Sequence, residues 1–363
     1  MQADLADAIR RHRAGDLAGA EAAYLAIVSH GEHADALCNL GLIAKARGRL
    51  DEAETYFVRA VQASPGGAIS AYNLGSLYWR AGRLADALPL LETAARHPQM
   101  TGAKENLGHV YLALGRDAEG WPLHDERTQR TQSKAQGLSF PEWRGEPLAG
   151  KRLFLWAEQG FGDQILAARF IPHLGAEVTY VCAPELARLF DGLGATVIPR
   201  AAENPIAPHD YWSLPLSLPR WCGPVPNSAY LTGHARSPSG GVGVAWKGNA
   251  LPDPGRSLPP DLAGELLALP GALSLHPEDT GARDFQDTAD IVAGLDLVVT
   301  IDTSIAHLAG ALGKPTLVLL QHHIVDWRWR DGPPWYASVE VLRQPAPGDW
   351  RGLVDAIIRR LSA

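Results

Sequence analysis

The feature that most constrains the fold is a segment, residues 295–320, in which two nearly continuous apolar runs flank a stretch of small residues. Asp302-Thr303-Ser304 follows the first run, and Gly313-Lys314-Pro315 precedes the second. Apolar runs without alternation are typical of strands that are covered on both faces, as in a parallel sheet. The segment therefore predicts a strand, a helix and a second parallel strand, which is the βαβ unit of an α/β domain.

The start of the predicted helix is an expected phosphate site. Its first backbone N–H groups lack intrahelical partners and lie at the positive end of the helix dipole. Ligands of open α/β sheets also bind at this strand edge. We expect Thr303 and Ser304 to contact a phosphate, and His307 to reach a ribose or phosphate; the alternative is that His307 is structural. Asp302 is expected to cap the helix and order the turn, because its carboxylate would repel a phosphate.

A repeat of 33 or 34 residues occupies the N-terminal third of the chain. It resembles the tetratricopeptide repeat, a helix pair in which glycine and alanine let the two helices approach closely. Three copies are clear, and a fourth, ending near Trp121, is partial. The positions that keep phase are Gly15, Gly48, Gly82 and Gly115, then Ala20, Ala53 and Ala87, then the Leu-Gly pairs that begin at Leu40, Leu74 and Leu107.

Asparagines share this period: Asn39, Asn73 and Asn106 directly precede the three Leu-Gly pairs. On the first helix of stacked repeats they would form a ladder along the concave face. A side-chain amide donates and accepts at once, so a ladder of amides can hold an extended peptide backbone without reading its sequence. O-GlcNAc transferases use asparagines at the matching repeat position in this way. The alternative is that the three amides are solvated.

From Lys151 onward, strand-like and helix-like segments alternate, which predicts parallel sheets. A proline-rich stretch, 199–238, divides the strands into two sets, and an amphipathic helix is expected at 350–361. Two Rossmann-like halves with a cleft between them account for this order. Besides the two strands of the βαβ unit, strands are expected at 152–157, 178–181, 195–198 and 242–246.

Asp163 is the candidate general base. Gly160 and Gly162, after the first strand, would let a ligand approach the backbone, and a carboxylate at that strand end can accept the proton of a hydroxyl. The alternative is that Asp163 caps the following helix. Lys247 follows a strand at the corresponding place in the second half. It is expected to supply a positive charge to a diphosphate leaving group, and the alternative is a solvated loop lysine. Because Ile165 stands where a dinucleotide fingerprint needs its third glycine, an NAD-dependent oxidoreductase is not indicated.

Composition excludes several classes of function. A net charge of −7 gives no basic surface for nucleic acid. No apolar run is long enough to span a membrane, and no signal peptide is evident. Cys38, Cys182 and Cys222 lack disulfide or metal spacing. Adjacent histidines such as His322-His323, even with Asp326 nearby, rarely hold one ion. We expect a cytoplasmic protein without metal or cofactor.

Together these motifs resemble bacterial tetratricopeptide-repeat glycosyltransferases, whose catalytic part is similar to heptosyltransferases and more distantly to O-GlcNAc transferase. The resemblance implies a GT-B fold, a nucleotide-sugar donor held by the C-terminal lobe, and no required metal. It also implies that Asp163 matches the base of heptosyltransferases, and that Asp302, Thr303, Ser304 and His307 match their donor-phosphate element. The segments that carry it are 150–164, 287–290, 302–315, 326–329, 335–336 and 343–344.

The predicted fold class is α + α/β, a helical repeat solenoid followed by a compact GT-B part with two Rossmann-like lobes. The predicted function is transfer of a sugar from a nucleotide-sugar to a hydroxyl, with a protein or peptide held by the repeats as acceptor. The alternative is a non-enzymatic repeat scaffold with a degenerate transferase domain. The expected boundaries are repeats at 1–121, a linker packed on the catalytic part at 122–149, an acceptor lobe at 150–238, a donor lobe at 239–347 and a C-terminal helix at 348–363.

Overall fold

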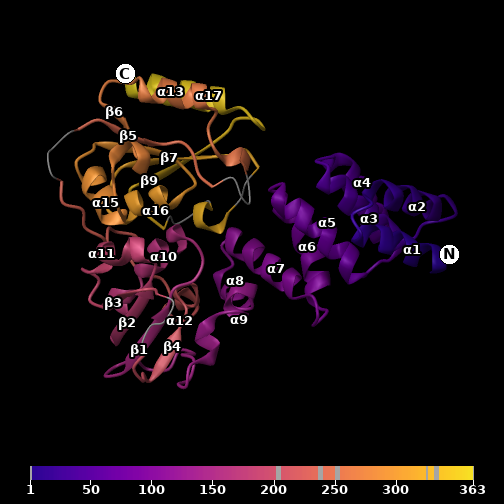
Figure 1. Ribbon diagram of the computed structural model, residues 1–363, viewed down its shortest axis with the longest axis horizontal. Helices are drawn as coiled ribbons and strands as arrows, with labels where there is room; N and C mark the ends of the chain where they lie inside the picture. Colours follow the sequence, from indigo (N-terminus) through magenta and orange to yellow (C-terminus); the bar gives the residue numbers. More distant parts are fainter. Residues whose placement is uncertain are drawn as a thin grey trace. The chain divides into compact units, whose positions relative to one another are not determined.

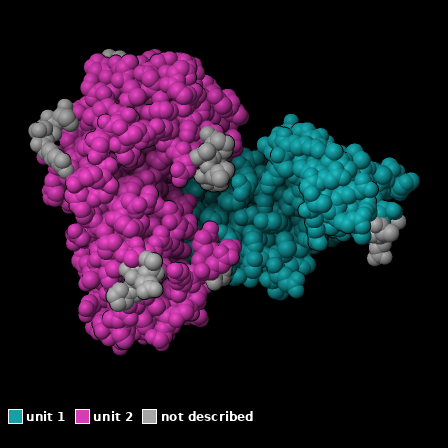
Figure 2. Space-filling model, viewed as in Figure 1, with its two compact units in different colours: residues 1–127, 325–327 teal, residues 128–324, 328–363 magenta. Residues whose placement is uncertain are grey.

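The computed structural model describes residues 2–201, 206–235, 240–249, 254–323, 326–330 and 335–362. Two compact units make up the chain, one formed by residues 1–127 with 325–327 and the other by residues 128–324 with 328–363 (Figure 2). Repeats thus form one unit, and both expected halves of the catalytic part lie in the other. The predicted domain boundaries themselves stay predictions.

The first unit is built from four consecutive helix pairs (Figure 1). Each periodic glycine lies in the turn within a pair, with φ of +83°, +75°, +74° and +75° at Gly15, Gly48, Gly82 and Gly115. That left-handed conformation is open to glycine at little cost, which explains the period. The fourth copy, predicted as partial, forms a helix pair whose second helix, α8, has 8 residues, against 13, 14 and 12 in α2, α4 and α6. The helices are α1 (Gln2–Arg13), α2 (Leu17–Ser29), α3 (Ala34–Ala46), α4 (Leu50–Ala63), α5 (Ala68–Arg80), α6 (Leu84–Ala95), α7 (Thr101–Ala113) and α8 (Asp117–His124).

Glycines let the two helices touch in the pairs α3–α4, α5–α6 and α7–α8. Gly41 faces the ring of Phe57, and a Cβ on Gly75 would lie 2.9 Å from Cγ of Leu91. On Gly108 it would lie 2.9 Å from the backbone nitrogen of His124. Any side chain at these positions would push the helices apart, so the Leu-Gly register is a packing requirement.

The second unit begins with a four-stranded parallel sheet in the order β3-β2-β1-β4. The three strands expected here are confirmed, whereas β4, a short strand inside the proline-rich stretch, was not predicted. Before the sheet, Phe140 packs edge-on against Phe154 of β1, with ring centroids 6.1 Å apart. The strands are β1 (Arg152–Trp156), β2 (Glu177–Cys182), β3 (Thr196–Pro199) and β4 (Tyr211–Ser213), and the helices are α9 (Thr128–Thr131), α10 (Phe161–Ala168), α11 (Ala187–Phe190) and α12 (Leu218–Cys222).

A second parallel sheet follows, in the order β6-β5-β7-β8-β9. Its βαβ unit of β7, α16 and β8 confirms the segment that most constrained the sequence, and α17 confirms the expected C-terminal helix. The strands are β5 (Val242–Ala245), β6 (Ala272–Ser274), β7 (Leu297–Ile301), β8 (Thr316–Leu320) and β9 (Val339–Arg343), and the helices are α13 (Pro260–Leu267), α14 (Pro277–Thr280), α15 (Phe285–Ala293), α16 (Ser304–Ala311) and α17 (Trp350–Ser362).

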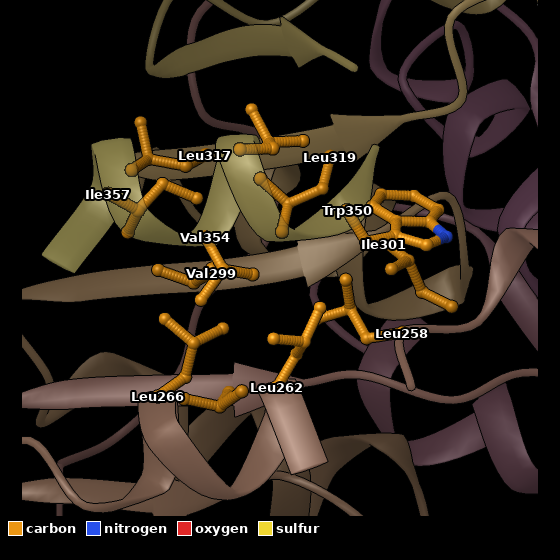
Figure 3. Packing of buried hydrophobic residues seen from close by; sticks show 12 residues of the cluster. Leu258, Leu262, Leu266, Val299, Ile301, Leu317, Leu319, Trp350, Val354 and Ile357 are labelled. Carbon is orange, nitrogen blue, oxygen red and sulfur yellow. The ribbon is translucent and has the colours of Figure 1, made fainter. Parts of the chain in front are cut away.

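Helices cover both faces of this sheet. On one face, Val299 of β7 and Leu319 of β8 pack with Leu266 of α13 and Val354 of α17 (Figure 3). On the other face, Val298 belongs to a cluster with residues of α15 and α16. Both faces are therefore buried, which is why the two strands read as continuous apolar runs.

Candidate functional site

Two strand-to-helix turns of the second unit, from β1 to α10 and from β7 to α16, meet at Gly162. A Cβ on this glycine would lie 2.7 Å from Cδ2 of His307 and 3.5 Å from Cα of Ser304. The first turns of α10 and α16 are therefore in contact through a position that has no room for a side chain. The structure thus brings together the predicted loop glycine Gly162 and the predicted donor residues Ser304 and His307.

Gly160 is the N-cap of α10, with φ of −80° and ψ of 174°. Its nearest neighbour for an added Cβ is an oxygen of Asp163 at 3.6 Å, an ordinary contact. The turn instead uses Gln159, which has a φ of 58° and is the only non-glycine residue with positive φ among those described. A left-handed glutamine is uncommon and directly precedes the site, and no sequence pattern pointed to it.

Asp163 has hydrogen-bond donors on both carboxylate oxygens. Its Oδ2 accepts from the Gly160 backbone N–H at 3.3 Å, which is the helix-capping role considered as the alternative. Its Oδ1 accepts from Nε of Arg328 at 3.1 Å and also from Nη2 of the same guanidinium. Only 17% of the Asp163 side chain and 15% of the Arg328 side chain are exposed. The candidate base is therefore held in a largely buried ion pair that sequence reasoning missed.

Asp302 does not cap α16, so that expectation was wrong. Thr303 is the N-cap, and its hydroxyl accepts from the Ile305 backbone N–H at 3.3 Å. The reason is geometric: the side chain directly before the first helical residue reaches the free N–H groups, and Asp302 lies one residue too early. Asp302 Oδ1 instead accepts from Nε1 of Trp329 at 2.8 Å.

His307 is buried, with 4% of its surface exposed, and its ring is fixed on two sides. Nδ1 lies 3.0 Å from the hydroxyl of Tyr336, and the imidazole stacks on Trp329 with centroids 4.9 Å apart and planes at 25°. Tyr336 in turn lies flat on Gly310 of the same helix, where a Cβ would meet its ring at 2.5 Å. These contacts give His307 a structural role, and its predicted ligand contact stays a prediction.

A buried arginine supports this aromatic cluster. Arg169, 2% exposed at the end of α10, has its guanidinium carbon 4.4 Å from the ring centroid of Tyr336. It donates to the backbone oxygens of Leu166 and Trp335. Tyr230 donates to the Ile165 oxygen at 2.7 Å. Burial raises the pKa of Tyr336 well above its ordinary value, so its hydroxyl stays protonated beside His307.

Lys247 is half exposed and forms an ion pair with Glu278, while its ammonium lies 5.2 Å from the ring centroid of Trp246. Another cation lies near the start of α16. A Cβ on Gly248 would lie 3.1 Å from Cγ2 of Thr303 and 3.2 Å from Nε and Nη2 of Arg256. The Arg256 Nε is buried and has no hydrogen-bond partner in the described residues. Arg256 is thus beside the N-cap of α16, although the sequence suggested Lys247 for this role.

The lobes are also linked by charges. Arg188 of α11 contacts Asp284 at 2.7 Å and Asp287 at 3.3 Å. Hydrogen bonds from Arg283 and Arg188 hold the pKa of Asp287 well below its usual range. Phe161 of α10 also packs against Phe285, with centroids 5.0 Å apart. These contacts join the first sheet's helices to α15 within the same unit.

In the repeat unit, the three predicted asparagines lie on α3, α5 and α7, the first helices of their pairs. Asn39 donates to the Asp35 oxygen of its own helix at 2.8 Å. Asn106 donates to the hydroxyl of Ser76 on the neighbouring first helix at 2.8 Å, and the Asn73 side chain interacts with the Cys38 thiol. Two of the amides thus connect successive repeats, and their grip on a peptide stays a prediction.

The described residues also bear on metal binding and on contact with membranes. Within the described residues, no group of three or more His, Cys, Asp or Glu side chains is arranged to hold a metal ion. None of the helices in the described part of the chain combines the length and apolarity that crossing a bilayer requires.

Two family models match the chain. Residues 32–99 match the tetratricopeptide repeat, and residues 280–346 match glycosyltransferase family 9 (heptosyltransferase). The second range includes β7, α16 and the segment with Arg328 and Tyr336. The resemblance noted in the sequence is therefore confirmed for both parts: the chain combines tetratricopeptide repeats with a glycosyltransferase family 9 region.

Individual relatives are distant. Protein FlbA of Caulobacter vibrioides is 26% identical over 403 residues, an alignment that spans 90% of this chain and 66% of FlbA. The chain thus corresponds to just under two thirds of that relative. The crystal structure of MamA matches 33% of this chain and 71% of its own, at 22% identity and a TM-score of 0.30. YrrB, described as a tetratricopeptide-repeat protein with an unusual peptide-binding site, matches 37% of this chain and 70% of its own, at 21% identity and a TM-score of 0.33.

Proposed function

We propose that this protein transfers a sugar from a nucleotide-sugar donor to a hydroxyl of a protein or peptide acceptor, by metal-independent chemistry of the GT-B type. The observation that carries the proposal is the contact at Gly162, which joins the turn bearing Asp163 to the first turn of α16. A candidate base and a candidate phosphate site thereby lie on adjoining turns of one unit. The family 9 match over residues 280–346 supports the same chemistry.

In the proposed reaction, the acceptor oxygen attacks the anomeric carbon of the donor and a new C–O bond forms. The bond between that carbon and the phosphate oxygen breaks, and the nucleoside phosphate leaves with the electron pair. Asp163 takes the proton of the attacking hydroxyl. Negative charge develops on the departing phosphate, where the N–H groups at Thr303 and Ser304 stabilise it.

A cation beside the phosphate completes the proposed site. Lys247 was the sequence candidate, but its ammonium already pairs with Glu278. Arg256 lies against Gly248 together with Thr303 and has a buried Nε without a partner in the described residues. A guanidinium presents donors in a fork that suits phosphate oxygens. We therefore assign the main phosphate charge to Arg256 and keep Lys247 as the alternative.

The acceptor is proposed to bind along the first helices of the repeats. Asn39, Asn73 and Asn106 are half-buried there, so their second donor and acceptor atoms can serve a peptide. Alanine at Asn73 and Asn106 should weaken the use of protein acceptors and spare hydrolysis of the donor. Equal loss of both reactions would contradict the acceptor role.

The direct test is calorimetry with UDP-, GDP-, ADP-, dTDP- and CMP-sugars. A bound donor should stabilise the fold by mass action, and Arg256→Gln should weaken that binding more than Lys247→Gln does. Arg360→Gln, which removes a charge from an exposed ion pair with Glu340 on α17 and β9, is the matched control. If no nucleotide sugar binds, the transferase proposal is wrong.

A non-enzymatic scaffold remains the second candidate, favoured by one observation: both oxygens of Asp163 already accept hydrogen bonds. Under that reading, donor binding survives but no acceptor is glycosylated by the full chain. Turnover that depends on Asp163 would exclude the scaffold.

A further inference from the structure

The Asp163–Arg328 ion pair has a consequence for the order of events in the site. We propose that Arg328 exchanges partners: it holds Asp163 while the donor site is empty and moves to the diphosphate when the donor binds, which releases Asp163 to act as base. This inference rests on the proposed transferase function and adds Arg328 to it as a residue that controls when Asp163 is free.

The contact itself shows how firmly Asp163 is held. Nε and Nη2 of Arg328 both point at Oδ1, while Oδ2 accepts from Gly160. With 15% and 17% of the two side chains exposed, water does little to screen the attraction. A guanidinium on Oδ1 competes with an incoming proton for the same oxygen. In this state the Asp163 carboxylate is held in place, but its Oδ1 is already engaged by Arg328.

Trp329, the residue after Arg328, places Arg328 beside the turn from β7 to α16, which bears the predicted donor residues. Trp329 donates to Asp302 at 2.8 Å and stacks on His307, so the backbone after Arg328 is fixed against the first turn of α16. Arg343 fixes the other side by donating to the Trp329 backbone oxygen at 3.0 Å. Arg328 is thus one residue from two contacts with the predicted phosphate element.

Asp163 is equally close to that element along its own helix. Gly162, the preceding residue, is the position that touches Ser304 and His307. The ion pair therefore joins two segments that each contact the start of α16. A diphosphate bound at the N–H groups of α16 would lie beside a guanidinium that contacts Asp163, a group with a single negative charge.

Charge decides the direction of the exchange. A diphosphate offers more negative charge than one carboxylate and several oxygens arranged for bidentate contact, which an arginine fork prefers. Moving Arg328 to the phosphate leaves Asp163 Oδ1 with open lone pairs and keeps Oδ2 anchored on Gly160. The base becomes available only after the donor has bound, so the acceptor is activated beside a loaded site.

The test compares the affinity for the nucleoside diphosphate that the wild-type protein binds best, measured by calorimetry. In Asp163→Asn, the side chain that Arg328 contacts at this position is neutral, so Arg328 no longer has a charge on Asp163 to balance. Adding Arg328→Gln to Asp163→Asn should then lower the affinity for the nucleoside diphosphate by about tenfold or more, which is the scale of a lost charge-assisted contact. If Arg328 serves only to neutralise Asp163, the double variant will bind as tightly as Asp163→Asn, and the exchange is overturned.

Arg360→Gln in the same Asp163→Asn background is the control for loss of one positive charge, and it should change the affinity by less than about twofold. Thermal unfolding of each variant checks the fold. If the variant with Arg328→Gln does not fold, Arg328→Lys takes its place, because lysine keeps the positive charge but lacks the forked donors of arginine. A reduced affinity for the nucleoside diphosphate is still expected, and an unchanged affinity contradicts the proposal. Failure of the wild-type protein to bind any nucleoside diphosphate would instead refute the transferase function itself.

Discussion

The two turns that meet at Gly162 each carry an aspartate, and the two aspartates are held in different ways. Asp163 is the third residue of α10 and folds back to the N–H of Gly160, whereas Asp302 precedes the N-cap of α16 and reaches outward to Trp329. One carboxylate organises its own helix, and the other anchors a distant segment. An aspartate therefore takes a different role when its position relative to the N-cap changes by only a few residues.

Both aspartates are nevertheless tied to the same segment. Arg328 holds Asp163 and the next residue, Trp329, holds Asp302. The two turns are thus coordinated by consecutive residues located more than a hundred positions away from Asp163. The predictions below ask whether the two turns differ in function as they differ in structure.

The largest effect is expected for the turn from β1 to α10, which bears Asp163. Asp163→Asn should lower turnover by about a hundredfold or more, because the acceptor proton loses its base, while donor binding persists. Steady-state turnover together with calorimetry checks this. Asp302→Ala should instead reduce donor binding and turnover in parallel, because it releases Trp329 from the first turn of α16. Equal behaviour of the two variants would remove the distinction between the turns.

Gly162→Ala should be the most disruptive glycine substitution at the site. The added methyl would lie 2.7 Å from His307, so we expect a loss of about 1–3 kcal/mol in the free energy of unfolding, with weaker donor binding. Gly160→Ala has space and an ordinary φ, and should cost clearly less. Urea denaturation of both variants measures the difference. A Gly160→Ala protein as unstable as Gly162→Ala would contradict the close approach of the turns.

Trp329→Phe keeps a ring against His307 but removes the indole N–H that donates to Asp302. A lost hydrogen bond to a carboxylate should lower the free energy of unfolding by about 2 kcal/mol. Denaturant titration gives the value, and Trp79→Phe in the repeat unit, where the ring stacks on His109, is the matched substitution. If both cost the same, the bond to Asp302 contributes nothing measurable.

The smallest expected effect concerns the cap of α16. Thr303→Ala removes the hydroxyl that accepts from Ile305 and should cost about 1 kcal/mol of unfolding free energy. Asp16→Ala, at the N-cap of α2 where the carboxylate accepts from Gly19 at 2.9 Å, provides a comparison outside the site. A Thr303→Ala protein that loses donor affinity beyond its stability loss would support the predicted phosphate contact of Thr303.

Local patterns predicted much of this architecture. The βαβ unit and the repeats were readable because their determinants, apolar runs and turn glycines, lie within one element or one period. The short strand β4 was missed because prolines surround its three residues and it has no pattern of its own. Asp302 was assigned as a cap because spacing alone does not fix where a helix begins.

The partners within the site could not be predicted in the same way. Arg328 is separated from Asp163 by 165 residues, and Tyr336 from His307 by 29, so no local period relates them. Likewise, the sequence pointed to Lys247 and not to Arg256. The path of the chain after β5 decides which of these two cations lies near α16, and no local pattern encodes that path.

The pairwise packing of the repeats has a further consequence for how the protein unfolds. The helix pairs contact chiefly their neighbours in sequence, as α2 contacts α3 and α4 contacts α5. Cooperativity in such arrays passes from one pair to the next. Amide exchange should accordingly differ from one helix pair to the next, which makes the pair the unit in which this part of the chain opens under mild denaturant.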